Sequence, residues 1–159
     1  MKAPELKIGD SAPAFKLQDQ DGKPVVFKDF AGRKLLVYFY PRASTPGCTT
    51  QACGIRDAFA ELKDLGVAVV GISPDQPEAL KKFADKYSLN FTLLADPEKK
   101  AAADYFVLGE KKMFGKTSFG IIRSSFLVGE DGKVLKTWYK VKPEQTVPFA
   151  VDFVKTLGH

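Results

Sequence analysis

Residues 34–53 read KLLVYFYPRASTPGCTTQAC. The first seven, residues 34–40, form a continuous β-prone apolar run that stops at Pro41, as a strand buried on both faces of a sheet would. A helix is predicted to follow, ending at about Leu65. A strand that leads directly into a helix is where open α/β sheets place their functional sites. The quoted stretch is therefore the first place to look for chemistry.

The start of this helix carries a cysteine. Ser44 or Thr45 can act as the N-cap, and Pro46 then occupies the first helical position, where its missing N–H costs nothing. Cys48 falls in the first turn, where free N–H groups and the positive end of the helix dipole favour a thiolate over a thiol. A small buried hydrophobe is the alternative for an isolated cysteine, but the position at a helix start favours a reactive thiol.

Helical periodicity places the two cysteines of the chain in different environments. At 100° per residue, Cys53 lies about 140° from Cys48, on the solvent side of the helix. A surface cysteine without a function is the alternative interpretation of Cys53. Their Cα atoms would be about 8–9 Å apart, beyond the roughly 7 Å limit for a disulfide. A Cys48–Cys53 bond therefore requires the first helical turns to unwind. The residues within about 40° of Cys48 form an apolar stripe, so Cys48 should point toward the sheet: Ala52, Ile55, Phe59 and Leu62.

The rest of the chain alternates strand and helix patterns. An N-terminal β-hairpin is predicted around Asp21-Gly22 and a late hairpin around residues 130–133. Early strands alternating with helices and a late hairpin indicate an α/β fold with a mixed central sheet flanked by helices on both faces. The other predicted strands are residues 67–73 and 91–95. The other predicted helices are residues 77–87, a helix that begins with residues 97–105, and a helix after Thr146.

Length and composition limit the possible classes of protein. The chain has 159 residues, 45% of them hydrophobic and 27% charged, which fits one globular domain spanning residues 1–159. No apolar stretch approaches the roughly 20 residues of a membrane span. The net charge is +5, but the sequence has no long block of charges of one sign. The densest basic cluster is Lys111, Lys112 and Lys116, so nucleic-acid binding is not expected.

The N-terminus has no apolar region of a secretory signal, so a cytoplasmic location is expected. In that reducing compartment, two cysteines are more often working thiols than a structural disulfide. A zinc site is a poor fit, because such a site usually has four ligands and the chain offers two cysteines and His159.

Several runs together resemble a known family. Pro41, Thr45 and Cys48 match the P-x-x-x-T-x-x-C active-site signature of peroxiredoxins. The fuller run from Tyr38 to Asp57 resembles the bacterioferritin comigratory protein, or peroxiredoxin Q, subfamily. The resemblance covers nearly the whole chain and includes these segments: residues 71–73, 91–96, 109–112, 115–117 and 123–127.

The resemblance implies a thioredoxin-like fold and a peroxidase that reduces hydrogen peroxide and organic hydroperoxides without a metal or bound cofactor. By position, Cys48 would be the peroxidatic cysteine and Cys53 the resolving cysteine. Thr45 would bind the thiolate and peroxide through its hydroxyl, Pro41 would shield the pocket, and Arg123 would lie near the sulfur. The implied reductant is thioredoxin or possibly glutaredoxin, and the implied working form is a monomer.

Arg123 also stands out on physical grounds. It interrupts the apolar residues 121–122 and 126–128, an unusual place for a permanent charge unless an anion lies nearby. An edge-strand arginine that faces water is the alternative.

Two other functions are alternatives. Residues 109–117 look like a phosphate-binding P-loop, but five residues separate the glycines where four are required. A general thiol–disulfide oxidoreductase on the same fold is the second alternative. That chemistry prefers two cysteines separated by two residues, whereas four separate Cys48 from Cys53.

Overall fold

A computed structural model describes residues 5–113 and 115–157 of the chain. In these residues seven strands form one sheet: β1 (Lys16–Asp19), β2 (Pro24–Val26), β3 (Lys34–Phe39), β4 (Val67–Ser73), β5 (Thr92–Ala95), β8 (Ser124–Val128) and β9 (Val134–Trp138). Their order across the sheet is β2-β1-β5-β4-β3-β8-β9. Strands β3, β4 and β5 run parallel, while β1, β8 and β9 pair antiparallel with their neighbours. The predicted mixed sheet and N-terminal hairpin are therefore confirmed.

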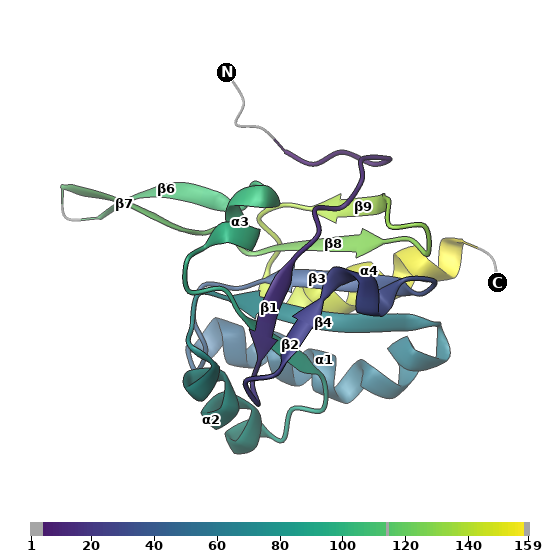
Figure 1. Ribbon diagram of the computed structural model, residues 1–159, viewed down its shortest axis with the longest axis horizontal. Coiled ribbons are helices and arrows are strands. Elements are labelled where there is room, and N and C mark those ends of the chain that lie inside the picture. The colour runs from purple at the N-terminus through teal and green to yellow at the C-terminus, as the bar shows by residue number, and fades with distance from the viewer. Residues whose placement is uncertain (1–4, 114, 158–159) are drawn as a thin grey trace.

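Helices cover the two faces of the sheet unequally (Figure 1). The helices are α1 (Pro46–Asp64), α2 (Pro77–Tyr87), α3 (Lys100–Asp104) and α4 (Thr146–Thr156), with short 3₁₀ turns η1 (Phe27–Phe30) and η2 (Pro143–Gln145). Side chains of α1, α2 and α4 pack together on one face. The other face is covered by α3, η1 and the segment before β1.

Strand β3 connects the two halves of the core. Its side chains alternate between the faces: Leu36 and Tyr38 pack under α1, whereas Leu35, Val37 and Phe39 pack on the α3 side. All five are at most 1% exposed. This is why the sequence from 35 to 40 is apolar without interruption: a central strand has no solvent-facing side.

The parallel strands direct their C-terminal ends to one edge of the sheet. Strand β3 pairs in register with β4 from Lys34↔Val67 to Phe39↔Ile72. The loop 41–45 that leads into α1 therefore lies beside the segment that follows Ser73 at the end of β4. This shared edge holds the site described below.

One pair of strands was not predicted from the sequence. Strands β6 (Leu108–Met113) and β7 (Lys116–Ile121) form a separate antiparallel hairpin that extends away from the main sheet (Figure 1). A strand–turn–strand is not the strand–loop–helix of a P-loop, so the structure contradicts that alternative.

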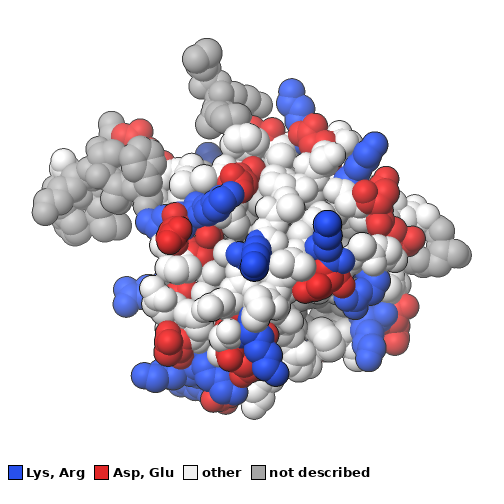
Figure 2. All heavy atoms as spheres, in the orientation of Figure 1, with Lys and Arg blue, Asp and Glu red and all other residues white. Residues whose placement is uncertain are grey.

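Positive and negative side chains are interspersed on the face drawn in Figure 2. The side chains of the basic cluster Lys111, Lys112 and Lys116, and all of His159, lie outside the described part of the chain. Among the described helices, none has the length and hydropathy needed to cross a bilayer.

Candidate active site

The β3–α1 junction forms as the sequence predicted. Thr45 is the N-cap residue, with extended backbone angles, and Pro46 is the first residue of α1. The Thr45 hydroxyl does not cap the helix; it donates a hydrogen bond to the Arg42 carbonyl at 2.8 Å. Ser44 has a φ of 66°, in the left-handed region. Cys48 consequently lies in the first turn of α1, where backbone N–H groups have no helical partner.

The orientation of the two cysteines follows the predicted helical stripe. Cys48 is 1% exposed and lies in the core with Ala52, Ile55 and Leu62. Cys53 is half-buried and not fully on the solvent side as predicted, because the side of α1 that carries it is partly covered. Both thiols are free, and both lie within one continuous helix.

Arg123 approaches the sulfur of Cys48. It lies in the short connection between β7 and β8, and its Nη2 is 3.4 Å from Cys48 Sγ. The guanidinium thus points into the site and not to water. A Cβ atom on Gly47 would lie 3.1 Å from the same Nη2, so the glycine leaves the space that the guanidinium occupies.

A buried hydrogen-bonded chain holds the guanidinium. Arg123 Nη1 donates to Gln51 Oε1 at 2.7 Å, and Gln51 Nε2 donates to Thr146 Oγ1 at 2.8 Å. Gln51 and Thr146 are each 1% exposed. Sequence reasoning missed Gln51, although its spacing of three from Cys48 places it on the same face of α1.

Two tyrosines lie in the same core cluster as Cys48. Tyr38 and Tyr40 are each 1% exposed, and their hydroxyl groups have no hydrogen-bond partner among the described residues. Burial raises the pKa of both tyrosines well above the ordinary value, so both remain neutral at physiological pH. Neither tyrosine therefore adds a negative charge to the site, whereas Arg123 places a positive charge 3.4 Å from the sulfur.

The remaining predicted site residues lie in the same loop. Pro41 directly follows the buried Tyr40 and is half-buried, and Thr45 is also half-buried. The Thr45 hydroxyl donates to a backbone carbonyl of the same loop, and no hydrogen bond among the described residues directs it at the Cys48 sulfur.

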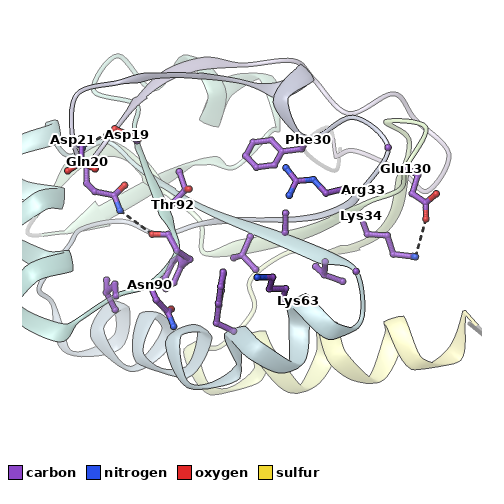
Figure 3. A pocket seen from close by; sticks show the side chains of 18 residues that line it. Asp19, Gln20, Asp21, Phe30, Arg33, Lys34, Lys63, Asn90, Thr92 and Glu130 are labelled. Atoms are coloured by element: carbon purple, nitrogen blue, oxygen red, sulfur yellow. Dashed lines mark hydrogen bonds and ion pairs between the residues drawn. The ribbon is translucent and has the colours of Figure 1, made fainter.

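A groove of about 860 Å³ lies elsewhere on the molecule (Figure 3). It is lined by the first residues of β3, β4 and β5, including Lys34, Val67 and Thr92, whereas Cys48 follows the far end of β3. The close-up shows Phe30, Arg33 and Lys63 around it, and none of the described residues that line it is a cysteine. The chemistry of the thiols therefore does not take place in this groove. Within the described residues, no three His, Cys, Asp or Glu side chains form a group that could hold a metal ion.

Comparison with known proteins gives consistent matches. The model of the AhpC/TSA family matches residues 8–137. Peroxiredoxin Bcp of Escherichia coli K12 is 57% identical over 129 residues, covering 81% of this chain and 83% of that protein. Peroxiredoxin Bcp of Bacillus subtilis is 40% identical over 153 residues, covering 96% and 98%.

Solved structures match as well. A structure of the Xanthomonas campestris bacterioferritin comigratory protein, from work on its alkyl peroxide reduction, aligns with a TM-score of 0.87 and 30% identity over 91% of this chain and 92% of that one. Peroxidoxin BcpB of Mycobacterium tuberculosis aligns with a TM-score of 0.87 and 29% identity over 98% and 100%. These matches confirm the thioredoxin-like fold.

Proposed function

Since the chain belongs to the AhpC/TSA family and is a peroxiredoxin of the Bcp group, we propose that Cys48 is its peroxidatic cysteine. The observation that carries the proposal is the buried Cys48 sulfur, in the first turn of α1, with the Arg123 guanidinium 3.4 Å away. The substrates are hydrogen peroxide and organic hydroperoxides.

The first step is attack on the peroxide. The Cys48 thiolate attacks the terminal oxygen, the O–O bond breaks, and the departing oxygen takes up a proton to leave as water or alcohol. The sulfur loses two electrons and becomes a sulfenic acid. No metal or bound cofactor takes part in this step.

Ionisation of the thiol cannot account for a fast reaction by itself. An ordinary cysteine is already a few per cent thiolate at neutral pH, so complete ionisation raises the rate by at most about thirtyfold, or about 2 kcal/mol. The larger effect comes from donors that stabilise the charge growing on the departing oxygen. Arg123, Thr45 and the backbone N–H groups at the start of α1 are the donors available, and Pro41 limits the access of water.

The second step regenerates the enzyme. The Cys53 thiolate attacks the Cys48 sulfenic acid, the S–S bond forms, and hydroxide leaves and is protonated to water. Because both cysteines belong to the same helix, the start of α1 must unwind first. A dithiol then reduces the disulfide by exchange. The proposal includes thioredoxin (or glutaredoxin) as this reductant, a cytoplasmic location, and a monomeric single domain as the working form.

The test is peroxide-dependent NADPH consumption through thioredoxin reductase and thioredoxin. The wild type should turn over, Cys48→Ser should be inactive, and Cys53→Ser should form the sulfenic acid once and then stall. Trapping with dimedone and mass spectrometry locates the sulfenic acid. Sustained turnover by Cys48→Ser would overturn the assignment, and insulin reduction without peroxidase activity would indicate a thiol–disulfide oxidoreductase.

A further inference from the structure

The loop 41–45 between β3 and α1 is held to another part of the chain by one side chain. Ala43 N donates a hydrogen bond to Asp75 Oδ2 at 2.8 Å. Throughout the described part of the chain, this is the hydrogen bond that ties loop 41–45 to a distant segment; the Thr45 hydroxyl bonds within the loop, to Arg42.

Asp75 is itself fixed by the end of β4. Ser73 Oγ donates to the same Oδ2 at 2.8 Å, and Asp75 N donates back to Ser73 Oγ at 3.3 Å. Ser73 is 1% exposed and pairs in β4, so it provides a rigid support. The carboxylate therefore receives two donors on one oxygen, and hydrogen bonds to a charged acceptor are the stronger kind.

The loop conformation needs this support. Ser44, next to Ala43, has the left-handed φ of 66° that residues other than glycine adopt at a cost. A strained backbone persists only where its surroundings hold it in place. The Ala43–Asp75 hydrogen bond is the contact in the right place to do so, two residues before the N-cap of α1.

From this arrangement we propose that Asp75 is a positioning residue that stabilises the wound start of α1, and thereby slows the Cys48–Cys53 disulfide step. This inference rests on the proposed function. When the hydrogen bond is present, the Cys48 sulfur stays beside Arg123, where it reacts with peroxide. When it is lost, the loop relaxes, the first turn of α1 unwinds more readily, and Cys53 reaches the sulfenic acid sooner.

The consequence is measurable as a competition. The Cys48 sulfenic acid either forms the disulfide with Cys53, releasing water, or its sulfur attacks an oxygen of a second peroxide. In the second case the O–O bond breaks, the sulfur is oxidised to sulfinic acid, and the departing oxygen takes up a proton and leaves as water or alcohol. Half of the sulfenic acid takes each route when the second-order rate constant for peroxide, multiplied by the peroxide concentration, equals the first-order rate constant of disulfide formation. The peroxide concentration for half-conversion to sulfinic acid therefore rises in proportion to the disulfide rate.

The experiment compares Asp75→Asn and Asp75→Ala with wild type by stopped-flow fluorescence of the single Trp138 and by mass spectrometry of the sulfinic acid. We expect disulfide formation to become about tenfold faster in Asp75→Ala, which corresponds to a loss of about 1.4 kcal/mol of stabilisation of the wound helix start. The increase in Asp75→Asn should be smaller. The peroxide concentration for half-conversion to sulfinic acid should rise by the same factor. Ser73→Ala, which removes the support and keeps the carboxylate, should shift both values in the same direction by a smaller factor.

Asp85→Asn is the matched control, because Asp85 is an exposed carboxylate on α2 whose partner is Lys81. It should leave both values unchanged. A disulfide rate within twofold of wild type in both Asp75 variants, with their far-UV circular dichroism intact, would overturn the inference. A wild type that forms no sulfenic acid in the dimedone assay would instead overturn the proposed function, and the two failures are thus distinguishable.

Discussion

Gln51 contributes to the site through its hydrogen bond with Arg123. Its amide oxygen accepts the hydrogen bond from Arg123 Nη1 at 2.7 Å, and its amide nitrogen is held by Thr146. A guanidinium with a long flexible stem loses considerable conformational entropy when fixed, and a buried partner lowers the cost of aiming it at the sulfur. Gln51 is thus the residue that fixes the direction of Arg123.

The first prediction concerns this hydrogen bond. Gln51→Ala should lower the second-order rate constant for hydrogen peroxide by about tenfold, because a hydrogen bond to a charged group is worth about 1.5–3 kcal/mol and only part of it is realised in the rate. Stopped-flow measurement of sulfenic acid formation tests this in a Cys53→Ser background. Thr50→Ala, an exposed neighbour in the same helix, is the control. An unchanged rate in Gln51→Ala would mean that Arg123 positions itself without Gln51.

The second prediction compares two glycines. A Cβ atom on Gly71 would lie 2.7 Å from the hydroxyl of the fully buried Tyr38, so Gly71→Ala forces the ring to move and should lower the free energy of unfolding by about 1–3 kcal/mol. On Gly54, within α1, a Cβ atom would lie 3.8 Å from Val147, an ordinary contact. Gly54→Ala should therefore raise the free energy of unfolding by about 0.5–1 kcal/mol. Urea denaturation measures both, and equal effects would contradict this packing.

The local sequence singles out some residues of this region and not others, for physical reasons. Cys48 and Arg123 are unusual in their local context, since one begins a helix and the other interrupts an apolar run. Gln51 and Asp75 are ordinary polar residues in sequence. Their importance depends on distant hydrogen-bond partners: Gln51 accepts from the Arg123 side chain 72 positions away, and Asp75 accepts from the Ala43 backbone N–H 32 positions away. Such long-range pairings leave no local pattern.

At the scale of secondary structure, the elements predicted best are those with strong apolar periodicity. Strand β4 and helix α2 have the predicted bounds, Val67–Ser73 and Pro77–Tyr87. The β6–β7 hairpin was missed because, within the described residues, its two strands form a separate sheet outside the main one, so its sequence is not selected for an apolar alternation. Its charged and glycine-containing sequence is instead typical of a loop.

The third prediction concerns the start of α3. Asp96 is 3% exposed, and its carboxylate accepts hydrogen bonds from the backbone N–H groups of Lys100, Ala101 and Ala102. Burial raises the pKa of Asp96, and these hydrogen bonds offset the rise in part. Because the folded pKa exceeds the unfolded one, the folded state binds a proton more readily. The stabilisation from this group therefore falls as pH rises from the ordinary value near 3.8 through the folded pKa, and is constant above it.

Asp96→Asn should consequently cost about 1–3 kcal/mol at neutral pH, because one buried N–H loses its acceptor. The cost should grow on acidification, since wild type gains stability from Asp96 there and the variant does not. Urea unfolding of both proteins between pH 4 and pH 7 measures the difference. The exposed Asp64→Asn provides the reference, and a difference that shrinks toward low pH would contradict the raised pKa.

At the scale of the whole molecule, the two apolar clusters are not independent. They lie on opposite faces of one sheet, and adjacent residues of β3 belong to different clusters, Leu36 to the α1 side and Val37 to the α3 side. Loss of either cluster exposes one apolar face of the central strands to water. A sheet with one apolar face exposed is not stable, so the strands should separate as well. The chain should therefore unfold as one cooperative unit.

The fourth prediction follows from this shared sheet. Thermal unfolding of the reduced protein should be a single transition with equal calorimetric and van't Hoff enthalpies, of about 110 kcal/mol at about 0.7 kcal/mol per residue. Fluorescence of Trp138 and far-UV circular dichroism should give the same midpoint. Leu36→Ala, which opens a cavity in one cluster, should cost about 2–5 kcal/mol, and Val37→Ala should destabilise the other cluster. Each variant should shift the whole transition without splitting it. Two midpoints in either variant would show that the faces unfold separately and that β3 does not couple them.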